Sequence, residues 1–245
     1  MKAIADASVA TAIGWHGKLP TVGDFATRRL NPAFVTVWDD WISRGLGLLR
    51  SRNPDQWQDA YLSSPTWRFV LTPGFLPPPL HTEPWTGVLM PSVDRVGRYY
   101  PLTLAFPLRA LPADPAGQSA LWTWLQQLQD AAIDALEDDW SIEALDAELL
   151  RLGLPPGHAG LRATIPPPSA PGDGHGAHGS MERFFAACAP DSPAYGRHGR
   201  CVWYNEADLS APSMECCTGM DDSVVRLWLP DATRPSIIPC ASESP

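Results

Sequence analysis

The chain has 245 residues and a formal net charge of −9, with 44% hydrophobic residues and 11 tryptophans. This composition excludes a wholly disordered chain, and it argues against general nucleic-acid binding because phosphates repel an acidic protein. The length is sufficient for a substantial hydrophobic core. The charge is uneven, since residues 1–110 hold 11 basic and 8 acidic side chains whereas residues 111–245 hold 7 and 19. Such polarity can steer a charged partner.

Neither a membrane span nor a secretory leader is expected. The sequence has no run of about 18 apolar residues, and its first residues lack a continuous apolar segment. The five cysteines all lie in the last quarter of the chain and form no CxxC pair, which argues against a disulfide framework. Together these features predict a protein of the reducing cytoplasm without membrane insertion.

The first half of the chain alternates turn signals with apolar segments. Residues 14–30 are rich in Gly, Pro and charge, which predicts loops and turns. Asn31-Pro32 is a typical helix start, and the apolar residues after it recur at helical spacing. We therefore expect helices over 32–50 and 54–61, then strands over 67–71, 85–90 and 99–107, the last two forming an antiparallel hairpin around 92–98.

The second half begins with two predicted helices and then changes composition. Asp114-Pro115 starts a helix that extends to Leu136, and Ser141 caps a second helix that Gly153 can end. Residues 130–148 hold eight acidic and no basic residues. Further on we expect a helix over 181–189, strands over 201–204 and 214–217, either a helical turn or a strand over 224–229, and a loose tail from 230.

Residues 154–180 are dominated by Pro and Gly, which predicts a flexible surface insertion. The chain after residue 180 is too short to form a separate core comfortably, so we expect one domain over 1–245. Interleaved helices and locally antiparallel strand pairs indicate an α/β layered domain with a mixed sheet.

The common catalytic and metal-binding motifs are absent or incomplete. Gly14-x-x-Gly17-Lys18 lacks the spacing and the hydroxyl residue of a phosphate-binding loop. His175 and His178 lie in the Gly-rich stretch, where a structural zinc site would lack rigidity and further ligands. No GxSxG or HExxH motif occurs. The sequence therefore predicts no metal, no cofactor and no defined catalytic group.

Two polar segments remain as candidates, and each combines turn residues with Asp and Arg. One spans 18–29, the other spans 92–98, and a strand between them carries an arginine. Arginine forms forked bonds to carboxylate or phosphate, and Asp can hold that fork in place. The segments are therefore either an internal salt-bridge network or a polar recognition patch. The candidate residues are Lys18, Asp24, Arg28, Arg68, Ser92, Asp94, Arg95 and Arg98.

The same segments resemble a known protein family. GKLPTVGDFATRRL (17–30), FVTVWDDW (34–41), PTWRFVLTPG (65–74) and WTGVLMPSVDRVGRYYPLTLAFPL (85–108) are similar to the TagF family of bacterial type VI secretion accessory proteins. The resemblance covers residues 14–108 best. It implies a cytoplasmic, three-layer α-β-α sandwich with a mixed, largely antiparallel sheet and no catalytic role.

The resemblance also implies a function by binding. Family members act as post-translational repressors of secretion-system assembly and are thought to work through the forkhead-associated (Fha) scaffold protein. Two surfaces are candidates for that contact: the Arg/Asp loops and the acidic segment 130–148, which would suit a basic partner face. The alternative is an undetected enzyme or small-ligand binder, with Asp24, Arg68, Ser92, Asp94 and Arg98 around one pocket. Their convergence on such a pocket would favour the alternative.

Overall fold

The computed structural model describes residues 12–157, 175–189, 199–206 and 213–229, to which all structural statements refer. Its strands form one seven-stranded sheet in the order β2-β1-β5-β4-β3-β6-β7. Every pairing between neighbouring strands is antiparallel, so the expectation of a largely antiparallel sheet is confirmed and only its mixed character is corrected. The strands are β1 (Gly14–Gly17), β2 (Ala26–Arg28), β3 (Trp67–Leu71), β4 (Trp85–Met90), β5 (Leu102–Pro107), β6 (Cys201–Asn205) and β7 (Ser213–Cys217).

The segment predicted as loops, 14–30, contains two strands. β1 pairs with β5 and with β2, which forms one edge of the sheet. The four residues of β1 are too few to show a strand pattern, and glycine stands at both ends. Gly17 has a φ of 142°, and a Cβ there would lie 2.2 Å from the Pro101 carbonyl oxygen. Glycine therefore permits the close approach by which β1 joins the sheet.

The predicted helices in the first two-thirds of the chain are present. They are α1 (Pro32–Arg52), α2 (Trp57–Leu62), α3 (Pro115–Glu137) and α4 (Ile142–Leu152). Asn31, Asp114 and Ser141 each accept a hydrogen bond from a backbone N–H of the first helical turn. These caps supply partners for amides that the helix leaves unpaired. Local sequence signals therefore determine where α1, α3 and α4 begin. In contrast, α2 begins at Trp57 and not at the predicted residue 54, and no side chain caps it.

In the last third of the chain, the structure decides between helix and strand for residues 224–229 and moves the start of the helix predicted over 181–189. Residues 224–229 fall largely within a 3₁₀ helix, η1 (Asp222–Trp228), so they are helical rather than extended. Helix α5 (His175–Cys188) begins inside the segment predicted to be a flexible insertion. The remainder of that segment from 158 to 174, and the tail from 230, lie outside the described residues. None of the described helices is both long and apolar enough to cross a membrane.

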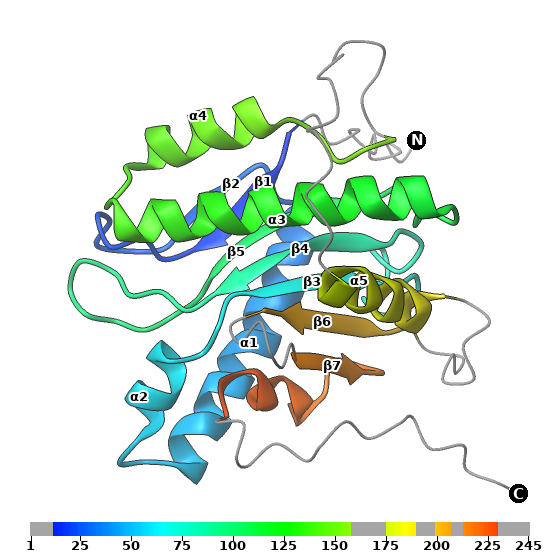
Figure 1. Ribbon diagram of the computed structural model, residues 1–245. Coiled ribbons are helices and arrows are strands. Elements are labelled where there is room, and N and C mark those ends of the chain that lie inside the picture. The colour runs from blue at the N-terminus through cyan, green and yellow to red at the C-terminus, as the bar shows by residue number, and fades with distance from the viewer. Residues whose placement is uncertain (1–11, 158–174, 190–198, 207–212, 230–245) are drawn as a thin grey trace, which may run out of the picture.

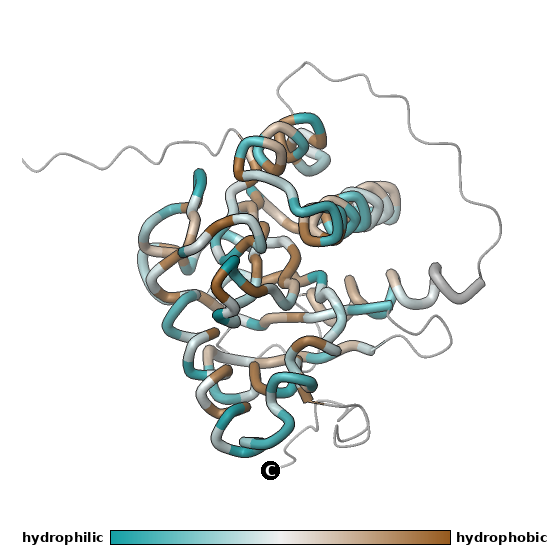
Figure 2. The backbone as a smooth tube through the Cα atoms, turned by 90° about the vertical axis from the view of Figure 1, so that its left-hand side faces the viewer, coloured by the Kyte–Doolittle hydropathy of each residue, from teal (hydrophilic) through white to brown (hydrophobic). Residues whose placement is uncertain are grey.

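Helices lie on both faces of the sheet, with α1 behind it and α3 and α5 in front in the view of Figure 1. Side chains alternate along each strand, so one face of β3 presents Trp67, Phe69 and Leu71 to α1 and η1. The other face presents Val70, together with Val88 of β4, to α3, α4 and α5. In Figure 2 apolar and polar residues alternate along the helices, as amphipathic helices require.

Tryptophans dominate the core on the α1 face. Trp38 packs against Phe34, Phe69 and Trp203, with ring centroids 5.1 to 6.0 Å apart. Its indole N–H donates to Thr103 Oγ1 at 2.9 Å, so the only polar atom of this buried side chain has a partner. Helix α1 is thereby anchored to the centre of the sheet.

Candidate functional site

The hairpin loop between β4 and β5 is organised by one aspartate. Asp94 accepts hydrogen bonds on Oδ1 from the backbone N–H of Val96 at 3.0 Å and of Arg98 at 2.9 Å. The Asp94 N–H donates to the Arg98 carbonyl at 3.0 Å, and Gly97 takes a φ of 80° that suits glycine. The carboxylate therefore shapes the loop that carries it.

The second oxygen of the same carboxylate binds two cations. Lys18 Nζ lies 2.6 Å and Arg98 Nε lies 2.7 Å from Asp94 Oδ2. Lys18 and Asp94 are both buried. Burial acts to raise the pKa of Asp94, but hydrogen bonds from Lys18 and from the Arg98 and Val96 amides outweigh it and hold that pKa well below its usual range. The carboxylate is therefore ionised and cannot serve as an acid near neutral pH.

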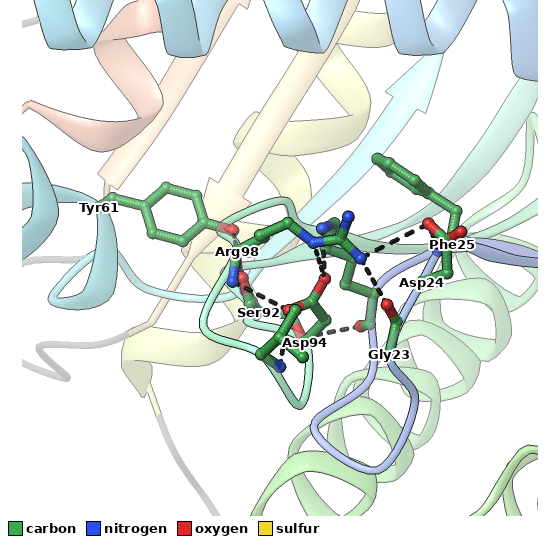
Figure 3. Close-up of polar contacts among 9 residues, drawn as sticks. Gly23, Asp24, Phe25, Tyr61, Ser92, Asp94 and Arg98 are labelled. Atoms are coloured by element: carbon green, nitrogen blue, oxygen red, sulfur yellow. Dashed lines mark hydrogen bonds and ion pairs between the residues drawn. The ribbon is translucent and has the colours of Figure 1, made fainter.

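Further contacts join this loop to the segment between β1 and β2, as Figure 3 shows. Arg98 donates through Nη2 to the Gly23 carbonyl and lies 3.7 Å from the Asp24 carboxylate. Ser92 Oγ donates to the Lys18 carbonyl at 2.8 Å. We call Lys18, Asp24, Ser92, Asp94 and Arg98 the Asp94 cluster. The cluster fastens the segment between β1 and β2 to the hairpin loop between β4 and β5.

Helix α2 supports the cluster from the side. The Tyr61 hydroxyl donates to the Ser92 carbonyl at 3.0 Å and accepts from the Ser92 N–H at 2.9 Å. Sequence reasoning missed Tyr61, because nothing in its local pattern distinguishes it from a core tyrosine. Since the Ser92 side chain is buried and donates to a backbone carbonyl, it is not presented as an exposed nucleophile.

The outer side of the cluster is exposed. Arg95 is fixed through its backbone N–H, which donates to the Val22 carbonyl at 3.0 Å, while its side chain makes no hydrogen bond or ion pair with a described residue. Phe25 is 45% and Val96 is 64% exposed, although both are large apolar residues. We call these three exposed side chains, which belong to the two loops that the Asp94 cluster joins, the rim.

Two of the predicted site residues have their contacts elsewhere. Arg68 donates to Gln129 of α3 at 2.9 Å and to Glu206 at 3.1 Å, and its guanidinium lies over the Trp122 ring. None of these contacts belongs to the Asp94 cluster. The five residues of the proposed enzyme pocket are therefore not brought together, because Arg68 is engaged between α3 and the end of β6.

Arg28 belongs to a second polar cluster, centred on Asp146 of α4. The Asp146 carboxylate lies 3.8 Å from Arg28 Nε and 2.9 Å from Arg29 Nη2, and it accepts from the Trp15 indole at 2.7 Å. Burial acts to raise the pKa of Asp146, but the Arg29 and Trp15 hydrogen bonds and the arginine charges lower it overall. One member of the acidic segment 130–148 therefore fastens α4 to the sheet edge.

The charged groups of the Asp94 cluster are paired with one another. Within the described ranges no group of three or more His, Cys, Asp or Glu side chains is placed to hold a metal ion. The charges of Lys18 and Asp94 neutralise each other inside the protein, and their effect is to fix the shape of the two loops. What the loops present outward is the rim of Phe25, Arg95 and Val96.

Comparison with known proteins identifies the class of this chain. The family described as the TagF N-terminal domain, type VI secretion system-associated, matches residues 14–152, which is more than half of the chain. The chain is also similar to the crystal structure of PA0076 from Pseudomonas aeruginosa PAO1, with 29% identity and a TM-score of 0.66. That match covers 96% of this chain and 100% of the other. A comparison with curated proteins found no match.

These findings define a type VI secretion system-associated protein. The chain belongs to the TagF family, as the motifs over 14–108 had indicated.

Proposed function

We propose that this protein is a non-catalytic, cytoplasmic regulator that represses assembly of a type VI secretion system by binding its forkhead-associated scaffold. Membership of the TagF family supports the link to the secretion system. The proposal of binding rather than catalysis rests on one observation, the closed Asp94 cluster. Its buried charges are already paired, so they orient loops instead of reacting with a substrate.

The proposed contact surface is the rim of Phe25, Arg95 and Val96. Aromatic residues and arginine are among the residue types that dominate binding energy at protein interfaces, and both are exposed here. Because the backbone of this region is fixed by the Asp94 cluster, little conformational entropy is lost when a partner binds. The rim therefore has both the chemistry and the rigidity of a docking surface.

Repression requires that the protein bind one state of the scaffold more tightly than the other. A ligand can shift a conformational equilibrium only by the difference in its affinity for the two states. The protein would thus hold the scaffold in the form that cannot support assembly. Phosphorylation is the modification we expect to separate these forms, since it changes local charge next to a cationic rim.

The test is calorimetry between the full chain and the forkhead-associated scaffold of the same secretion cluster, in phosphorylated and unphosphorylated forms. We expect saturable binding that differs between the two forms. Arg95→Glu should weaken it roughly tenfold or more, as for the loss of an interface hot spot. Arg52→Glu, an exposed arginine at the end of α1, is the matched control and should bind as the wild type does.

Three outcomes contradict the proposal. Absence of binding to both scaffold forms removes the direct mechanism. Equal affinity for both scaffold forms rejects the idea that the protein represses assembly by binding one form preferentially. If Arg95→Glu and Arg52→Glu weaken scaffold binding equally, the effect is one of overall charge, and the rim is rejected as the contact surface.

A further inference from the structure

A second group of polar side chains lies beside the rim, on the sheet face toward α1. His16 of β1 is buried, and its Nδ1 lies 2.7 Å from Thr27 Oγ1 of β2. The Phe25 ring stacks on the His16 ring at 5.5 Å with an interplanar angle of 6°. Tyr100 meets both rings edge-on. Phe25 therefore belongs to the exposed rim on one side and covers a histidine on the other.

Two buried polar atoms in this group make no hydrogen bond with any described residue: His16 Nε2 and the Tyr100 hydroxyl. Such atoms are uncommon in folded proteins and call for a physical reason. His16 Nε2 lies 3.9 Å from Oδ1 of the Asp39 carboxylate on α1. Burial raises the pKa of Tyr100, and the nearby Asp39 charge acts in the same direction. Asp39 is itself 42% exposed and thus open to solvent.

His16 and Asp39 offer hydrogen-bond acceptors, and no described lysine or arginine is paired with Asp39. Burial lowers the pKa of His16, although Asp39 acts to raise it, so the imidazole is neutral at pH 7. We place its proton on Nδ1, where it can donate to Thr27, because Nε2 has no acceptor within hydrogen-bond distance. Among the described residues, Asp39 has no Lys or Arg within 4.0 Å, and Lys18 near Phe25 is already bound to Asp94.

We propose that Asp39, His16 and Tyr100 form an acceptor site for a lysine or arginine side chain of a protein partner. One N–H nitrogen can lie about 2.9 Å from each of two acceptors that are 3.9 Å apart, so a single donor fits between His16 Nε2 and Asp39 Oδ1. The cation would enter from the side of Asp39, whose carboxylate is open to solvent. An aromatic ring beside the cation adds a favourable interaction.

A protein partner is favoured over a free small cation because the site is continuous with the rim. Phe25 contacts His16 and also lies 4.9 Å from Lys18 of the Asp94 cluster. Tyr100 lies two residues after the 92–98 loop, and its N–H donates to the Ser92 carbonyl at 3.1 Å. A partner that covers Phe25 would therefore reach Asp39 with the same surface. This inference rests on the proposed function, since it supplies a basic anchor for the same docking face.

The acceptor site can be tested without the scaffold. The ¹⁵N-labelled full chain is titrated at pH 7.5 with N-acetyl-arginine amide and, as an uncharged analogue of similar shape, N-acetyl-citrulline amide. We expect a saturable change of the His16 ring nitrogen signals with the arginine compound only. Asp39→Asn should weaken this binding roughly tenfold, as for loss of a charge-assisted hydrogen bond. Asp55→Asn, at another exposed aspartate, should leave it unchanged.

Tyr100→Phe, which removes only the hydroxyl, provides a second readout and should weaken the same binding. Equal signal changes with arginine and citrulline, unchanged binding in Asp39→Asn, or no change at His16 would each overturn the site. If the compounds bind as expected but Asp39→Asn binds the scaffold with wild-type affinity, the site exists and the protein partner is wrong. Absence of scaffold binding by the wild type would instead reject the proposed function, so the two failures are distinguishable.

Discussion

Lys18 Nζ lies 2.6 Å from Asp94 Oδ2, although 76 positions separate the two residues in the chain. This contact fastens the segment after β1 to the hairpin loop between β4 and β5. Both side chains are buried, so each charge depends on the other for its stability. The two loops that present the exposed rim are consequently one structural unit.

The first prediction concerns the carboxylate at the centre of this unit. Asp94→Asn should lower the free energy of unfolding markedly, because it leaves the buried Lys18 ammonium without its counter-charge. Asp24→Asn removes a carboxylate that is 78% exposed and should change stability by no more than about 0.5 kcal/mol. Urea unfolding followed by tryptophan fluorescence compares the two variants. Equal midpoints would show that the buried pair does not stabilise the fold.

A second prediction concerns acid pH. The pKa of Asp94 in the folded protein is below its value of 3.8 in an unfolded chain. The ionised carboxylate therefore stabilises the protein fully above pH 3.8, and this contribution is lost as the pH falls below 3.8 toward the folded pKa. Unfolding free energies measured from pH 6 to pH 2.5 should fall less steeply for Asp94→Asn than for the wild type. Parallel profiles would contradict the assignment.

The third prediction concerns the support from α2. Tyr61→Phe removes the hydroxyl that both donates to and accepts from the Ser92 backbone. The Ser92 carbonyl keeps its bond from the Tyr100 N–H, but the buried Ser92 N–H loses its partner. We expect a loss of about 1–3 kcal/mol in the free energy of unfolding. Calorimetric melting of the variant measures it. Tyr99→Phe, at a half-buried tyrosine next to the same loop, is the control and should melt close to the wild type.

A fourth prediction compares two glycines. A Cβ at Gly87 of β4 would lie 2.0 Å from the Leu104 carbonyl oxygen, so Gly87→Ala must displace the backbone of β5. It should cost at least about 1–3 kcal/mol. A Cβ at the helical Gly47 meets nothing within 4 Å, so Gly47→Ala should add about 0.5–1 kcal/mol. Denaturant midpoints that move in the same direction for both variants would contradict this reading of the sheet.

Much of the secondary structure could be predicted because its signals are local. Asn31, Asp114 and Ser141 cap their helices within three residues of their own positions. The strands over 67–71 and 85–90 were predicted with the bounds of β3 and β4. In contrast, β1 and β2 were missed, because their strand character arises from pairing with β5 and with each other. The sheet was correctly expected to be largely antiparallel, but its mixed character was wrong for the same reason, since strand direction depends on which strands become neighbours.

The candidate site divides in the same way. Residue types alone pointed to Lys18, Asp24, Ser92, Asp94 and Arg98, because Asp and Arg beside turn residues are the natural parts of a salt-bridge network. They could not reveal that Arg68 contacts Glu206, or that Arg28 shares Asp146 with Arg29. Most helix starts, the central strands and the family could thus be predicted from the sequence alone. Which charges meet was settled only by the folded chain, because ion pairs between distant residues depend on sheet register and helix placement.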